Sequence, residues 1–179
     1  MNTNKQRRLA DSKYNERRSQ CEEALKILQD GGVKISALCE LSPEQLENLK
    51  ALIKDELLVR RAKHCVYENQ RVKDAVSALK AGNLEKLGKL LNESHESLKN
   101  DYEVTGIELD TLAETAQKQD GCIGARMTGA GFGGCGIALV HKDKVEQFVE
   151  NVQTEYKKVV GYEASFFDCE SGDGVSHFN

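Results

Sequence analysis

The spacing of apolar residues predicts that the first two-thirds of the chain is helical. Apolar side chains recur there at intervals of three and four residues, which is typical of a helix that packs one face on a core. The predicted helices cover 14–29, a segment that begins at Ser42-Pro43, about 55–80, 84–98 and 109–116. The predicted core faces consist of Tyr14, Cys21, Ala24, Leu25 and Leu28 in the first helix and of Leu58, Ala62, Cys65, Val72, Val76 and Leu79 in the third.

Local signals mark where some of these helices begin and end. Ser42 can cap a helix, Pro43 suits a first turn, and Gln45 can reach back to the backbone amide of the cap. Two glycines, Gly31-Gly32, end the first helix, and Ala81-Gly82-Asn83 ends the third.

The pattern changes at Gly121. Residues 123–128 and 137–140 are typical of short strands, and helical spacing returns over 145–156. Further strands are predicted over 164–167 and 175–178. Helices followed by a strand–loop–strand–helix–strand unit predict an α+β fold, rich in helix, with a small antiparallel or mixed sheet. No repeat or linker divides the chain, so we expect one domain over 1–179.

Composition and charge exclude several classes of protein. The chain has 179 residues, of which 39% are hydrophobic and 30% charged, with a formal net charge of −4. The net negative charge argues against a nucleic-acid surface. The basic pairs are predicted to lie on solvated helix faces: Arg7-Arg8, Arg17-Arg18 and Arg60-Arg61. No apolar run is long enough to span a membrane, and the N-terminus does not resemble a signal peptide, so a cytoplasmic location is expected.

Cysteines and histidines carry little evidence of a site. The six cysteines include no C-x-x-C pair and are expected to be buried free thiols in a reducing compartment, while a thiol-based enzyme is an unsupported alternative. The segment His95–Lys99 begins like a zinc-protease helix but lacks the second histidine, so His95 is predicted to lie on a helix surface. Asp110 and Glu114 are likewise predicted to be solvated.

Glycine is concentrated in one stretch. Five of the eight residues from 129 to 136 are glycine. Such a loop needs positive φ angles or a close approach of its backbone to another group, and its exposed amides favour phosphate. It does not end in the Gly-Lys-Ser/Thr of a Walker loop and leads into a strand rather than a helix, so it is neither a Walker nor a dinucleotide loop. Phosphate binding and tight packing of a hairpin remain equally supported.

The run Arg126-Met127-Thr128-Gly129-Ala130-Gly131-Phe132-Gly133-Gly134-Cys135 resembles the third motif of the GHMP small-molecule kinases, and Phe132 and Cys135 resemble its galactokinase branch. Three further stretches resemble that branch in the same order: 11–21, with Asp-Ser-Lys-Tyr-Asn; 60–69, with Arg-Arg-Ala-Lys-His; and 92–104, with Ser-His-Glu-Ser-Leu. The chain departs from many relatives at Thr105-Gly106-Ile107, which lacks a proline, and at Ala130, which replaces a glycine.

The resemblance implies a helix-rich GHMP kinase C-terminal domain that takes part in phosphorylation of the galactose 1-hydroxyl by ATP with Mg²⁺. By the same resemblance, Tyr14 contacts the sugar, and the residues beside the nucleotide phosphates are Gly129, Ala130, Gly131, Phe132, Gly133 and Gly134. The catalytic aspartate of the family belongs to an N-terminal half that we do not find in these residues. We therefore expect no catalytic residue, no tightly bound cofactor and no activity in the chain alone. The alternative is a galactokinase-like module that senses or binds sugar without catalysis.

Overall fold

The computed structural model describes residues 1–5, 10–170, 172 and 174, with the side chains of residues 10–12 excepted. The regular elements, in chain order, are α1 (Ala10–Asp30), α2 (Pro43–Leu49), α3 (Glu56–Lys80), α4 (Leu84–Asn100), α5 (Ile107–Gln117), β1 (Cys122–Thr128), β2 (Cys135–Val140) and α6 (Val145–Val160). Short 3-10 turns lie at Leu38–Glu40, Lys50–Leu52 and Lys142–Lys144. The predicted helix-rich α+β fold with a small sheet is confirmed.

The predicted start of α2 is confirmed in detail. The Ser42 hydroxyl accepts the Gln45 amide at 3.2 Å, and the Gln45 side-chain oxygen accepts the Ser42 amide at 2.8 Å. Two donors that the helix itself leaves without partners are thereby satisfied. Asp55 caps α3 in a similar way, because its carboxylate accepts the Leu57 amide at 2.7 Å.

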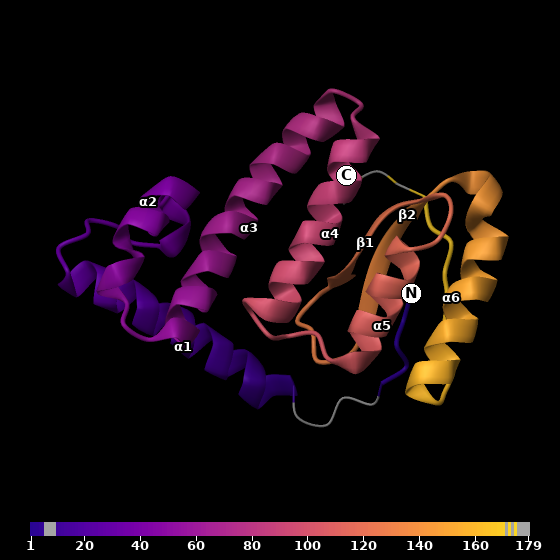
Figure 1. The fold of residues 1–179 in the computed structure, drawn as a ribbon, viewed down its shortest axis with the longest axis horizontal. Helices are drawn as coiled ribbons and strands as arrows, with labels where there is room; N and C mark the ends of the chain where they lie inside the picture. Colours follow the sequence, from indigo (N-terminus) through magenta and orange to yellow (C-terminus); the bar gives the residue numbers. More distant parts are fainter. Residues whose placement is uncertain (6–9, 171, 173, 175–179) are drawn as a thin grey trace, which may run out of the picture.

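The helices and strands enclose two main apolar clusters. Helices α1, α2 and α3 surround the first, and α5, α6 and the two strands surround the second (Figure 1). Helix α4 lies between them and packs on both α3 and β1. A smaller cluster beside α4 consists of Leu98, Val104, Leu109 and Met127, with Tyr102 and Phe132 packed against it. This third cluster supports the loop that joins β1 to β2.

The sheet has two antiparallel strands, and Thr128 pairs with Cys135 next to the connecting loop. The predicted strand over 164–167 is wrong, because only Ser165 forms a bridge, with Asn2. Asn2 also forms a bridge with Cys135. The start of the chain therefore lies between β2 and the segment around Ser165. The predicted strand 175–178 lies outside the described residues.

The predicted core face of α3 is only half correct. Leu58 and Ala62 are buried, but Val72, Val76 and Leu79 are 56%, 45% and 58% exposed. Figure 1 shows the second half of α3 extending with α4 beyond α1. Among the described elements, α4 is the one that packs along this half, so a different face is covered there, and Ala78 is buried instead.

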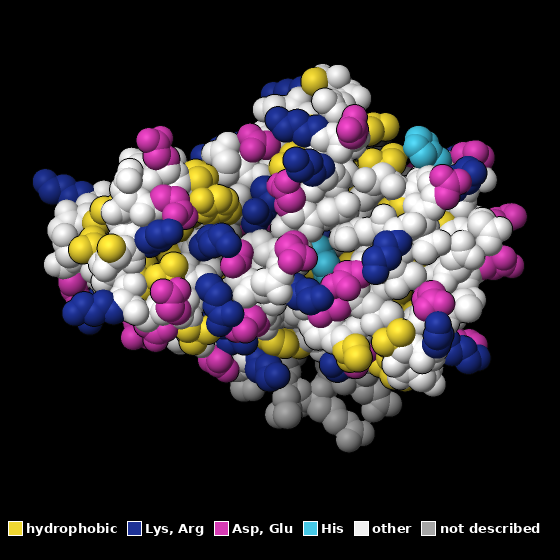
Figure 2. Space-filling view, viewed as in Figure 1, with side chains coloured by type: hydrophobic (Ala, Val, Ile, Leu, Met, Phe, Trp, Pro, Cys, Tyr) yellow, Lys and Arg dark blue, Asp and Glu magenta, His cyan; other side chains and the backbone are white. Residues whose placement is uncertain are grey.

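The surface mixes both signs of charge. On the face drawn in Figure 2, basic and acidic side chains alternate over the described elements. Two of the arginines predicted to be solvated are not: the side chain of Arg17 is 11% exposed, and Arg61 is 1% exposed. Arg7 and Arg8 lie outside the described residues. Arg61 is the more deeply buried of the two. Its guanidinium donates to the Gln20 side chain at 2.8 Å and to the Asp101 carbonyl at 2.6 Å, which ties the turn after α4 to α1 and α3. No helix in the described part of the chain combines the length and the apolarity needed to cross a membrane.

Candidate functional site

The loop between β1 and β2 adopts left-handed backbone conformations almost throughout. The φ angles of Gly129, Gly131, Gly133 and Gly134 lie between 80° and 114°, and that of Phe132 is 58°. Residues with a Cβ rarely adopt such angles, so the glycines are required by the path of the chain. The first expectation for this loop, positive φ angles, is confirmed.

The inner half of the loop packs closely on the turn after α4 and on the start of the chain. A Cβ at Gly131 would lie 2.0 Å from the Val104 carbonyl oxygen. The same oxygen accepts the Phe132 amide at 2.7 Å, and the Gly134 carbonyl accepts the Thr3 amide at 2.8 Å. Hydrogen bonds therefore hold the loop at two points, Phe132 and Gly134, to segments that are distant in the sequence.

The outer half of the loop is open. Gly129 and Ala130 are exposed, and their backbone amides make no hydrogen bond to another residue of the described chain. A Cβ at Gly129 would meet no atom within 4 Å. The two halves of the loop therefore differ in their surroundings. Its inner half serves packing, and its outer half presents free donors of the kind that bind an anion.

The start of α1 lies beside this loop. The ammonium of Lys13 sits 5.4 Å from the centre of the Phe132 ring, in the range of a cation–π contact. Tyr14, the next residue, is 54% exposed, so its predicted place in the apolar face of α1 is wrong. The apolar cluster begins further along the helix, at Cys21. The structure therefore brings together two of the segments singled out in the sequence, with Tyr14 free to contact a ligand.

The outer edge of β1 is completed by side chains rather than by a third strand. Asn92 and His95, one turn apart on α4, accept the amides of Ala125 and Met127 at 2.9 and 3.3 Å. The Gln117 side chain of α5 donates to the Ala125 carbonyl at 2.8 Å. These bonds satisfy backbone groups that an edge strand would otherwise leave unpaired. They also fix the strand that leads into the glycine loop.

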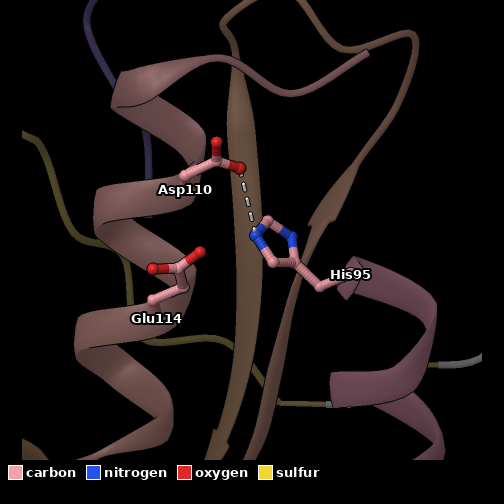
Figure 3. Close-up of side chains that lie close together, drawn as sticks. All are labelled: His95, Asp110 and Glu114. Atoms are coloured by element: carbon pink, nitrogen blue, oxygen red, sulfur yellow. Dashed lines mark ion pairs between the residues drawn. The ribbon is translucent and has the colours of Figure 1, made fainter. Parts of the chain in front are cut away.

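His95 belongs to a cluster that the sequence did not reveal. It is 1% exposed, and its Nε2 lies 3.4 Å from Asp110 Oδ1, while Glu114 lies one turn further along α5 (Figure 3). The prediction that His95 lies on a helix surface is therefore wrong. The prediction that Asp110 is solvated is wrong in part, because its side chain is 20% exposed. The only sequence signal is that Asp110 and Glu114 are four residues apart and so share a helix face.

The hydrogen bonds of this cluster disfavour a metal. Because Nδ1 of His95 accepts the Met127 amide, a neutral ring carries its proton on Nε2, the atom that faces Asp110. Glu114 is already paired with the Lys99 ammonium, whose charge would repel a cation. Burial works to raise the pKa of Asp110, but His95, Thr105 and Lys99 outweigh it, and the pKa lies below its ordinary value. The cluster thus holds α4, α5 and β1 together.

A groove of about 430 Å³ lies elsewhere, mainly between α3 and α4. Its lining consists of Lys63, Tyr67, Arg71, Asn92, Glu93, Glu96, Ser97, Asp101 and Gln117. None of the predicted sugar or phosphate contacts lines it. We therefore take the glycine loop with the start of α1 as the candidate site.

Known proteins resemble the chain over most of its length. Residues 75–158 match the model of the family described as GHMP kinases C terminal. The chain is 59% identical to the galactokinase of Ligilactobacillus salivarius over 175 residues and 57% identical to that of Clostridium perfringens over 174 residues. These matches cover 98% and 97% of the chain, respectively, but only 45% of each relative.

A solved structure is similar over nearly the same region. The chain is 60% identical to Lactococcus lactis galactokinase, whose crystal structure was determined in complex with galactose. The two folds superpose with a TM-score of 0.90, over 93% of this chain and 42% of that one. The chain thus spans less than half the length of the galactokinases it matches.

Proposed function

Since the chain belongs to the GHMP kinases and carries the C-terminal domain of that family, we propose that it serves as the C-terminal part of a galactokinase. The reaction is transfer of the ATP γ-phosphate to the 1-hydroxyl of galactose with Mg²⁺. The main support is identity of 57–60% to galactokinases over almost the whole chain. We treat residues 1–179 as one domain and expect it to act in the cytoplasm.

Tyr14 is the proposed sugar contact. Its phenol can donate a hydrogen bond to a sugar hydroxyl or accept one from it, while the ring packs on the pyranose. The exposure of Tyr14 and the proximity of its neighbour Lys13 to Phe132 support this role. Together they would place sugar beside the nucleotide loop.

The proposed phosphate contact is the glycine loop, from Gly129 to Gly134. The free amides of Gly129 and Ala130 suit an anionic oxygen, and the packing of Gly131 on Val104 holds the loop in one position. ATP would supply the phosphoryl group, and Mg²⁺ would neutralise its charge. Phosphoryl transfer depends mainly on positioning and charge neutralisation, so a rigid loop contributes without a titratable side chain.

The catalytic residues are proposed to come from a partner segment that corresponds to the N-terminal half of the relatives. The chain by itself is then expected to form no galactose phosphate from ATP, Mg²⁺ and galactose. Turnover by the chain alone at the rate of a full-length galactokinase would contradict this assignment of roles.

A chimera tests the proposal directly. The matching part of Lactococcus lactis galactokinase is replaced by this chain, and galactose phosphate is measured with ATP and Mg²⁺. At 60% identity we expect kcat/KM within about tenfold of the parent, a change of roughly 1.4 kcal/mol. A folded chimera that binds galactose but does not phosphorylate it would favour the sugar-binding module instead.

A further inference from the structure

Two cysteines that are far apart in the sequence meet between α1 and α3. The Sγ atoms of Cys21 and Cys65 lie 3.6 Å apart, although 44 residues separate them in the chain. Both side chains are half-buried at the edge of the first apolar cluster. The prediction of buried cysteines is therefore wrong, because Cys122 is also half-buried and the other three are exposed. Neither Cys21 nor Cys65 takes part in the candidate site described above.

The surroundings of the pair favour a reactive thiolate at Cys21. The hydrogen bond between the two thiols, with a smaller contribution from the charge of Arg61, lowers the pKa of Cys21 to about 7 against the opposing effect of burial. The same hydrogen bond, together with burial, raises the pKa of Cys65. The Tyr102 hydroxyl oxygen lies 4.0 Å from the Cys21 sulfur, within reach of a hydrogen bond from the Cys21 thiol. The two thiols thus share a proton unequally, an arrangement typical of dithiols that oxidise readily.

The two sulfur atoms are close enough to form a disulfide after a small movement. A disulfide has an S–S bond of about 2.0 Å, so the sulfurs must approach by roughly 1.6 Å, which side-chain rotation and a small helix shift can provide. We propose that Cys21 and Cys65 form an oxidative modification site, at which a peroxide converts the thiol pair to a disulfide that links α1 to α3.

The chemistry balances with hydrogen peroxide as the oxidant. The Cys21 thiolate attacks one peroxide oxygen and the O–O bond breaks. Hydroxide is released, and Cys21 becomes a sulfenic acid. Cys65 then attacks that sulfur as it loses its thiol proton, the S–S bond forms, the S–O bond breaks, and the departing hydroxide takes up this proton as water. The two thiols lose two electrons and two protons, and two water molecules are the products.

Peptide mapping after oxidation tests the site. The chain, freed of reductant, is treated with a small excess of hydrogen peroxide, digested without reduction and analysed by mass spectrometry. We expect a cross-linked peptide pair containing Cys21 and Cys65 that is lighter than the two free peptides by two hydrogen atoms. Cys21→Ser and Cys65→Ser should each abolish it, whereas Cys122→Ser, which alters a half-buried cysteine in β1, should not.

Other products would overturn the proposal. These are a sulfinic or sulfonic acid on Cys21 without a cross-link, a disulfide that joins Cys65 to the exposed Cys39, or disulfides only between molecules. A second measurement does not depend on oxidation: alkylation of Cys21 by iodoacetamide at pH 7 should slow about fivefold in Cys65→Ala, because the donor to its thiolate is lost. An unchanged rate in a variant with unaltered circular dichroism would also contradict it.

Discussion

Gly131 lies so close to Val104 that a Cβ on the glycine would come within 2.0 Å of the valine carbonyl oxygen. The adjacent amide, that of Phe132, donates to this same oxygen at 2.7 Å. The contact joins the glycine loop to the turn that follows α4. Arg61 of α3 donates to the Asp101 carbonyl of that turn. The position of the loop therefore depends on α3 as well as on the two strands.

Gly131→Ala should therefore lower the free energy of unfolding by about 3 kcal/mol or more, because it combines a backbone clash with an unfavourable φ. The control is Gly129→Ala, which has a similar φ of 80° but no neighbouring atom within 4 Å. Its expected cost is about 1 kcal/mol. Urea denaturation measures both, and equal losses would contradict the packing described for the inner half of the loop.

Tyr14→Phe should affect sugar binding but not stability. Tyr14 is 54% exposed, so removing its hydroxyl should change the free energy of unfolding by less than about 0.5 kcal/mol. In the chimera, loss of a hydrogen bond to sugar should raise the galactose KM about tenfold. The matched control is Tyr162→Phe, at a tyrosine 38% exposed beyond the end of α6, which should leave the KM unchanged. The same KM in both variants would remove Tyr14 from the proposed site.

His64 should make the fold sensitive to mild acid. Burial lowers the pKa of His64 to about 4 from an ordinary value of 6.5, while its Nδ1 lies 3.0 Å from the Ser97 hydroxyl and its ring stacks on Tyr102. Between these two pH values the unfolded chain binds a proton that the folded chain does not. The contribution of His64 to the free energy of unfolding is therefore fully present above pH 6.5. It falls by roughly 3 kcal/mol as the pH drops to about 4.

Urea denaturation across this pH range measures the effect. His64→Gln should remove most of the slope between pH 6.5 and pH 4.5, whereas His141→Gln, at an exposed histidine, should keep it. An unchanged slope in His64→Gln would show that other groups cause the acid sensitivity.

His95→Ala should destabilise the domain without involving a metal. The substitution leaves the Met127 amide without its acceptor and removes a side chain that is 1% exposed, at a cost of about 3 kcal/mol. Zinc added to the unmodified chain should not raise the melting temperature, and nitrogen-15 NMR should show the proton of the neutral ring on Nε2. A zinc-dependent increase that His95→Ala abolishes would instead establish a metal site.

Much of the local structure follows from the sequence. Periodicity and turn chemistry, which depend on residues close in the chain, predict the helices from α1 to α6, both strands, the cap at Ser42 and the strained glycine loop. The four stretches that resemble galactokinases likewise indicated the family later supported by the comparisons. The roles of Tyr14 and of residues 129–134, and the single domain over 1–179, stay predictions.

Only the tertiary structure decided which apolar positions are covered and which distant groups meet. Val72 and Tyr14 follow the helical period yet are exposed, because no element in the described part of the chain packs over them. His95 is buried because β1 needs an acceptor along its free edge, and Cys21 meets Cys65 because α1 crosses α3 at that turn. Periodicity records where apolar side chains lie on an element, whereas burial and long-range contacts depend on how whole elements pack against each other.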